Sequence, residues 1–327
     1  RWAPVAVVAT PGALPAVFRV VNRLSQHCGQ DAEVDTVEAL QDALETLGVL
    51  LGDVRGSGAR AAAEDPVAER RGLEVAEHAL RHTQNGKDLL RLLGATDVST
   101  QYDAMVVLQR IYHRIPKPIN DALLADPMSL NRLMHILQNS HVDYVRNEAL
   151  SFLLLLTVAN AELQQIVTMQ ELPETVFAML REEGLCTGGK IARDLIRCLS
   201  NLAGNTTCQR CIRETGGLGA LVSAMGDALS GARPDADEEE EDDLGGRRMD
   251  VPEEARWACF LLLADVALAF LGDGGGARQG EPRPEADSNR EALVRHGALD
   301  LLRHLPEATP TLEVKLRLVR LFEALEA

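Results

Sequence analysis

One short stretch of the chain has the spacing of a phosphate-binding loop. Residues 184–190 read GLCTGGK and match the pattern GxxxxGK. A working loop of this kind follows a strand and carries Ser or Thr after the lysine to hold magnesium. Here the preceding segment has a helical pattern, and Ile191 follows the lysine. A turn between helices explains these glycines better than a nucleotide site does.

The cysteines raise the question of metal or redox chemistry. Cys208 and Cys211 form a CxxC pair, and Cys198 lies ten residues earlier. A structural zinc site needs four ligands, usually from a second close pair, and no histidine lies near these cysteines in the sequence. We therefore interpret the six cysteines as reduced core residues. With no HExxH motif and no paired-carboxylate spacing, we expect no catalytic residues, no metal and no cofactor, so the chain is not expected to be an enzyme.

A row of polar side chains is the strongest candidate for a binding site. Arg193, Arg197 and Asn201 stand four residues apart on one face of a predicted helix. The apolar face of the same helix carries Leu195, Leu199 and Leu202. One repeat earlier the equivalent positions include Asn147 and Ser151. We expect these five polar residues to line a concave protein-binding groove, although an ordinary solvated helix face explains exposed arginines as well.

The elements that position this row form a repeat. Residues 144–229 pass twice through one unit, in which a buried helix is followed by a break and two shorter helices. Aligning Leu155 with Asn201 also aligns Ile166 with Ile212, at an offset of 46 residues in both cases. Such periods are typical of armadillo and HEAT arrays. One unit cannot cover its own apolar face and needs stacked neighbours. The sequence therefore predicts an all-α solenoid of about six repeats, forming a single domain over residues 1–327.

Other helices and three interruptions follow from local patterns. Apolar residues at helical spacing predict helices over Asp35 to Leu51, Asp97 to His113, Met128 to Leu137, Glu253 to Leu271 and Thr311 to Ala327. Gly94 is expected to cap a shorter helix that ends at residue 93. The segments near 52–66, 231–252 and 272–288 are rich in Gly, Pro or acid. They lack the apolar residues needed to offset the entropy of ordering, so we expect disordered loop insertions there.

Composition favours protein partners over nucleic acid or lipid. Hydrophobic residues make up 46% of the chain and aromatic residues only 3%, which suits a helical core better than a β-sandwich. The formal net charge is −16, and removing the eight acids of the run 235–243 leaves −8. An acidic body disfavours binding to phosphate backbones and to anionic lipid. No apolar run reaches the roughly 18–20 residues of a membrane span, so no direct membrane insertion is expected.

Several strings occur in the order found in one known family. They are DPMSLNRLMHIL at 126–137, VRNEALSFLLLLT at 145–157 and AELQQIVTMQELPETVFAML at 161–180, followed by a Gly-Gly turn at 188–189. With them the chain resembles the armadillo-type globular head of the general vesicular transport factor family, the Uso-type Golgi tethers. The resemblance extends from about Asp35 to Leu202 and continues beyond that only as a repeat pattern.

The resemblance implies a non-enzymatic scaffold that tethers vesicles between endoplasmic reticulum and Golgi. Its implied partners are a Rab-type GTPase, golgins and SNARE or tethering complexes, with self-association as a homodimer also implied. The implied location is the cytoplasm, peripheral to Golgi or transport-vesicle membranes. A tether is expected to continue into long heptads after Ala327. The alternative is another armadillo adaptor, such as a chaperone cofactor or cargo adaptor, whose groove holds an extended peptide.

Overall fold

The regular elements of the chain are helices throughout the part that the structure describes. The computed structural model describes residues 13–26, 34–52, 66–80, 83–158, 160–183, 189–230, 253–272, 284–305 and 312–326. The chain divides into two compact units, Arg1–Leu156 and Thr157–Ala327. None of the helices within these ranges combines the length and hydropathy needed to cross a membrane. The prediction of an all-α protein is confirmed, and the prediction of a single domain stays a prediction.

The first unit contains the helices up to α10, except that the last residue of α10, Thr157, belongs to the second unit. They are α2 (Ala13–Leu24), α3 (Val34–Leu51), α5 (Pro66–Leu80), α6 (Thr83–Arg91), the 3-10 helix η1 (Leu92–Gly94), α7 (Val98–Tyr112), α8 (Pro116–Ala125), α9 (Pro127–Asn139) and α10 (Asp143–Thr157). The second unit contains α11 (Ala161–Met169), α12 (Leu172–Glu183), α13 (Lys190–Ala203), α14 (Thr206–Glu214), α15 (Gly217–Ser230), α16 (Glu253–Phe270), α17 (Pro284–Arg295), α18 (Ala298–Arg303) and α19 (Leu312–Glu326).

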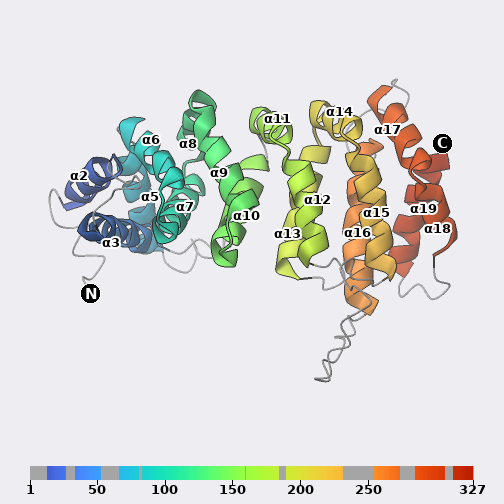
Figure 1. Ribbon diagram of the computed structural model, residues 1–327, viewed down its shortest axis with the longest axis horizontal. Helices are drawn as coiled ribbons and strands as arrows, with labels where there is room; N and C mark the ends of the chain where they lie inside the picture. The colour runs from blue at the N-terminus through green and yellow to red at the C-terminus, as the bar shows by residue number, and fades with distance from the viewer. Residues whose placement is uncertain are drawn as a thin grey trace. The chain divides into compact units, whose positions relative to one another are not determined.

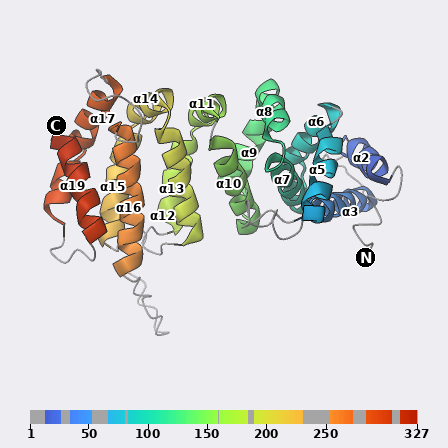
Figure 2. The same ribbon diagram turned by 180° about the vertical axis from the view of Figure 1, so that it is seen from behind.

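From α6 onward the helices repeat in groups of three, with the 3-10 helix η1 counted as one of them. In the second unit the first helices α11, α14 and α17 contact one another in turn, and the last helices α13, α16 and α19 form a second row (Figures 1 and 2). In the first unit α6–η1–α7 and α8–α9–α10 form two groups, and α3 packs beside α7. Within the described ranges the last helices are α3, α7, α10, α13, α16 and α19, in agreement with about six repeats.

Asparagine side chains begin the first helices of two successive groups. Asn160 Oδ1 accepts a hydrogen bond from the backbone N–H of Leu163 at 3.1 Å. Asn205 Oδ1 accepts one from the backbone N–H of Thr207 at 3.0 Å. Each bond satisfies a donor that the first turn of a helix leaves without an intrahelical partner. These caps explain why α11 and α14 begin at equivalent places in the repeat.

The sequence offset between successive repeats changes by one residue at the connection into α14. Helices α10 and α13 end 46 residues apart, at Thr157 and Ala203, whereas α11 and α14 begin 45 residues apart. The connection into α14 is thus one residue shorter than the connection into α11. The alignment of Ile166 with Ile212 is therefore wrong by one residue. Val167 is the buried equivalent of Ile212, and Ile166 is only half-buried.

Buried amides connect successive groups in the second unit. Gln209 on α14 donates from Nε2 to the carbonyl oxygen of Ala203 at 2.6 Å, and Gln164 on α11 donates to that of Thr157 at 2.8 Å. The fully buried Asn289 on α17 donates a hydrogen bond from Nδ2 to Gln209 Oε1 at 3.1 Å. Carbonyl groups at helix C-termini lack intrahelical donors. These amides satisfy them inside the core and fix the register between groups.

The expected loops lie largely outside the described residues, but one boundary is wrong. Nothing described covers 53–65 or 231–252. The third expected loop reaches residue 288, whereas α17 already begins at Pro284. Gly94 ends η1 as expected, but it is not in the left-handed conformation of a glycine cap. A Cβ atom at Gly94 would lie 2.9 Å from Arg132 Cδ, so this glycine makes room for the arginine side chain.

Candidate functional site

The predicted row on α13 presents its two arginines to solvent. Leu199 is 2% exposed, and its two leucine neighbours on the apolar face, Leu195 and Leu202, are fully buried. Arg193 and Arg197 are exposed on the other side of the helix. The side-chain Nη1 of Arg197 lies 3.4 Å from Asp194 Oδ1, so a neighbouring acid partly offsets its charge. Arg193 has no ion-pair partner among the described residues. Both arginines are thus exposed on the face opposite the leucines, and their contact with a partner stays a prediction.

The third member of the row has a structural role instead. Asn201 is half-buried, and its Nδ2 donates a hydrogen bond to Thr157 Oγ1 at 3.0 Å. Thr157 is fully buried, so this bond satisfies a polar group inside the core. We conclude that Asn201 supports the position of α13. Whether it also contacts a partner stays a prediction.

The equivalent residues on α10 fall in the other compact unit. Asn147 and Ser151 are both half-buried, and they belong to unit Arg1–Leu156, whereas the arginines belong to Thr157–Ala327. Asn147 Oδ1 is buried and accepts no hydrogen bond from the described residues. A groove shared by all five residues therefore stays a prediction.

The cysteines take the positions expected of core residues. Cys198, Cys208 and Cys259 are buried, and Cys211 is half-buried. Burial, together with the charge of Asp194, raises the pKa of the Cys198 thiol far above its usual value. Burial likewise raises the pKa values of Cys208 and Cys211. A thiol with a raised pKa is a weak nucleophile and a weak metal ligand at neutral pH. The remaining two cysteines and most of the 184–190 motif lie outside the described residues.

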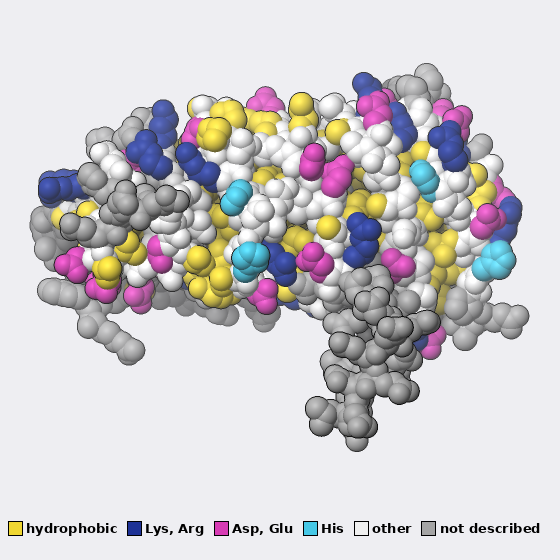
Figure 3. All heavy atoms as spheres, viewed as in Figure 1, with side chains coloured by type: hydrophobic (Ala, Val, Ile, Leu, Met, Phe, Trp, Pro, Cys, Tyr) yellow, Lys and Arg dark blue, Asp and Glu magenta, His cyan; other side chains and the backbone are white. Residues whose placement is uncertain are grey.

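Charge on the visible surface is mixed. On the face in Figure 3, Lys and Arg side chains are scattered among Asp and Glu side chains over the described residues. Nucleic-acid binding depends on a clustered basic face, and the face in Figure 3 is not of that kind. Within the described ranges, no group of three or more His, Cys, Asp or Glu side chains is arranged to hold a metal ion.

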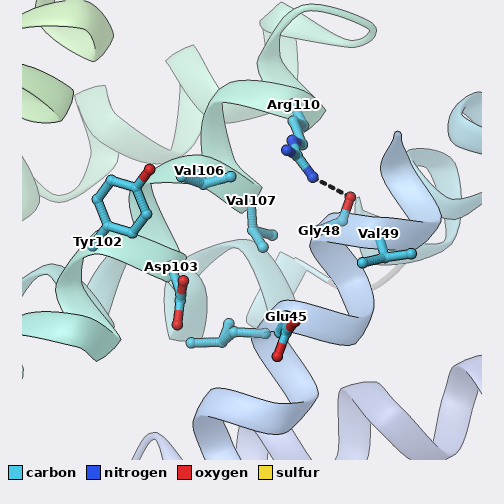
Figure 4. Close-up of a pocket in the computed structure, with 9 residues that line it drawn as sticks. Glu45, Gly48, Val49, Tyr102, Asp103, Val106, Val107 and Arg110 are labelled. Carbon is cyan, nitrogen blue, oxygen red and sulfur yellow. Dashed lines mark hydrogen bonds between the residues drawn. The ribbon is translucent and has the colours of Figure 1, made fainter. Parts of the chain in front are cut away.

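Sequence reasoning missed a pocket between α3 and α7. The hollow has a volume of about 290 Å³. It is lined by Leu44, Glu45, Gly48 and Val49 of α3 and by Tyr102, Asp103, Val106, Val107 and Arg110 of α7. Figure 4 shows the carboxylates of Glu45 and Asp103 toward one side of the hollow and Arg110 toward the other. Its lining combines apolar and charged side chains, and its two sides carry opposite charge. Such a combination can fix the orientation of a ligand.

The two sides of the pocket differ in how their charge is satisfied. Arg110 donates from Nη1 to the backbone carbonyl of Gly48, near the C-terminal end of α3, where a cation is favourable. Among the described residues, no basic side chain forms an ion pair with Glu45 or Asp103. Burial, together with the charges of Glu45 and Asp97, raises the pKa of Asp103 to about 6. A positively charged group placed beside Glu45 and Asp103 would therefore be electrostatically favourable.

Comparisons with known proteins connect the sequence to transport factors. General vesicular transport factor p115, from Bos taurus and from Homo sapiens, is 28% identical over 138 residues, which are 42% of this chain and 14% of each relative. Golgin candidate 6 from Arabidopsis thaliana is 31% identical over 116 residues, which are 36% of this chain and 12% of that relative. The aligned segments are thus a small fraction of these longer proteins. No protein-family model matches the chain.

Solved structures give the fold. A crystal structure of Uso1-1 matches with a TM-score of 0.69 and 16% identity, and the match covers 96% of this chain and 49% of that one. A designed armadillo repeat protein in complex with a (KR)4 peptide matches with a TM-score of 0.55 and 16% identity, over 93% of this chain and 99% of that one. At these identities the likeness concerns fold alone, and it confirms the armadillo-type solenoid.

Proposed function

This chain is related to the general vesicular transport factor family, and we propose that it serves as a non-enzymatic, protein-binding head domain in vesicle transport between endoplasmic reticulum and Golgi. The observation that carries the proposal is that relatives named as transport factor and golgin, from animals and a plant, share sequence with this chain. The Uso1-1 structure supports it by matching 96% of the chain in fold. We place the protein in the cytoplasm, peripheral to Golgi or vesicle membranes.

The partners we propose are a Rab-type GTPase together with golgins and SNARE or tethering complexes, and the chain acts as a homodimer. Arg193 and Arg197 supply the contact, because they are exposed and stand one turn apart on a helix whose opposite face is buried. The rest of the chain is acidic, so a local basic pair orients an acidic surface of the partner. Reversing both charges removes that attraction. It also breaks the ion pair between Arg197 and the buried Asp194, so the thermal unfolding of the double variant is compared with that of the parent.

The test is direct binding of the purified chain to a panel of purified Rab-type GTPases, each loaded with GDP or with a non-hydrolysable GTP analogue. We expect at least one GTPase to bind in its GTP form. Arg193→Glu with Arg197→Glu should weaken that binding by about ten-fold or more, since each rim charge contributes on the order of 1 kcal/mol. The matched control is Arg295→Glu with Lys315→Glu, which reverses two exposed charges on α17 and α19.

The control variant should bind like the parent. If both double variants bind equally well, the arginine pair is not the contact. If no GTPase binds in either nucleotide state, the GTPase part of the proposal is refuted, while a role in tethering through golgins remains to be measured with those proteins.

A second candidate function is the binding of an extended peptide by an armadillo adaptor. The observation that favours it is the pocket between α3 and α7, which lies between the last helices of two successive helix groups. One solved armadillo protein of similar fold holds a (KR)4 peptide. A peptide laid across such helices inserts individual side chains between them.

A further inference from the structure

We propose that the pocket between α3 and α7 binds the side chain of a lysine or arginine from an extended segment of a protein partner. This inference rests on the peptide-binding candidate above and is independent of the transport role. The site is the side of the hollow that Glu45, Val49, Tyr102, Asp103 and Val106 line. Arg110 lines the opposite side, away from the two carboxylates. Its acidic side receives the ammonium or guanidinium group, and its apolar walls receive the aliphatic stem.

The size of the hollow favours one side chain. Its volume of about 290 Å³ lies just below the roughly 300–1,000 Å³ range of small-molecule pockets. Lysine and arginine bury their aliphatic stems along apolar surface while the charged group reaches a polar partner. Val49 and Val106 supply that surface, and Val49 is 51% exposed at the rim. The dimensions and the apolar rim thus suit a long, amphipathic side chain.

The two carboxylates of the pocket favour an ammonium or guanidinium group, which donates hydrogen bonds, over a metal ion. Glu45 and Asp103 come from different helices and approach the same hollow. No third acidic, His or Cys side chain among the described residues joins them in a metal-binding group, so a divalent cation lacks ligands here. The raised pKa of Asp103 reflects desolvation and repulsion from Glu45 and Asp97. An ammonium or guanidinium group relieves that repulsion and donates to both carboxylates.

An aromatic pair closes one side of the site. Tyr102 lines the pocket, and its ring meets that of Tyr144 on α10 edge to face, with ring centroids 5.2 Å apart. This contact holds the Tyr102 ring beside the acidic side chains. An aromatic face attracts ammonium and guanidinium groups, so Tyr102 adds to the preference for a basic residue over a neutral one.

The binding test uses fluorescence anisotropy with labelled octapeptides. The first peptide alternates lysine and arginine, and the second replaces every residue with glutamine. The acidic run 235–243 also attracts basic peptides, so each titration is repeated on a chain whose acids in that run are replaced by serine. We expect the basic peptide to bind both chains and the glutamine peptide to bind at least about ten-fold more weakly.

Three variants locate the binding. Glu45→Gln with Asp103→Asn removes the two acidic charges and should lower the affinity for the basic peptide by about ten-fold or more. Val106→Phe fills the hollow without changing charge and should lower that affinity by a similar factor. The matched control, Glu77→Gln with Asp121→Asn, removes two exposed acids from α5 and α8 and should bind within about two-fold of the parent.

Three results would overturn the inference. In the first, the pocket double variant binds the basic peptide like the parent. In the second, Val106→Phe binds normally while the double variant does not, which places the cation on the open surface. In the third, the glutamine peptide binds as tightly as the basic one. That last result leaves peptide binding intact and removes only the preference for basic side chains.

Discussion

Replacing Leu199 with alanine tests the packing of α13 within the second unit. Leu199 is 2% exposed, and α13 packs against both α12 and α16. A buried Leu→Ala change costs about 2–5 kcal/mol, and the cost grows with the cavity that remains. The neighbouring side chains of Leu195 and Leu202 are themselves fully buried, so little can move in to fill the space. We therefore expect a loss of about 3–4 kcal/mol in the free energy of unfolding.

The assay is urea unfolding followed by tryptophan fluorescence and by far-UV circular dichroism. Trp257 on α16 is 4% exposed and packs edge to face on Phe260, so its emission reports on the second unit once Trp2 is replaced by phenylalanine. Ser200→Ala, an exposed change on the next residue of the helix, is the control and should stay within about 0.5 kcal/mol. A loss for Leu199→Ala as small as that of the control would refute burial between stacked helices.

Two further predictions follow from electrostatics and from packing. Because the pKa of Asp103 is raised to about 6, the folded state holds more protons than the unfolded state between about pH 4 and pH 6, so stability falls as pH rises through that window. Asp103→Asn should therefore stabilise the chain by about 1 kcal/mol at pH 8, a value discounted for the exposure of this half-buried group, and urea unfolding at pH 4 should show no gain. Gly217→Ala should destabilise the chain by about 1–3 kcal/mol, because its Cβ would lie 2.9 Å from the backbone oxygen of Ile212. Gly226→Ala in the same helix meets nothing closer than 3.8 Å and should stabilise by about 0.5–1 kcal/mol; equal thermal shifts for the two glycine variants would contradict this account.

Helices whose apolar periodicity is strong were predictable from the sequence. The expected helix Asp35 to Leu51 is observed as Val34–Leu51, and Leu40, Leu44 and Leu47, which stand at helical spacing in it, are fully buried. Such a pattern is local, because side chains three and four residues apart share one face. The helix class and the repeat therefore followed from spacing alone.

Helices that begin in proline- and acid-rich sequence were harder to predict. α5 begins at Pro66 and α17 at Pro284, in segments whose composition indicates loops. Proline is tolerated in the first turn, where its missing N–H has no partner to lose, and acids there favour the positive end of the helix dipole. Glu285 in α17 also accepts hydrogen bonds from Arg213 and Arg210. Contacts of this kind join residues more than 70 positions apart and leave no local pattern.

The pocket could not be predicted for the same reason. Glu45 and Asp103 lie on two correctly predicted helices, but periodicity does not say which faces of two helices meet. The exposure of the row on α13 was easier to predict, because helical spacing alone places Arg193 and Arg197 on the side opposite the buried leucines. Asn201 continues that spacing and yet bonds to Thr157, a partner 44 residues away. Helical spacing thus predicts which residues share one face of a helix. Contacts with residues distant in the sequence determine which of these side chains can still bind a partner.

The arginine pair on α13 should attract acidic ligands, and the pocket between α3 and α7 should attract basic ones. Varying the ionic strength distinguishes binding in the pocket from nonspecific attraction of a basic peptide to an acidic chain. Exposed charges separated by more than a Debye length, about 8 Å at physiological salt, are largely screened. Scattered surface acids therefore lose their attraction for a basic peptide as salt rises. A cation held between Glu45 and Asp103 is partly desolvated and is screened less. The basic peptide binding that survives at high salt should thus disappear in the pocket double variant and persist in the control variant.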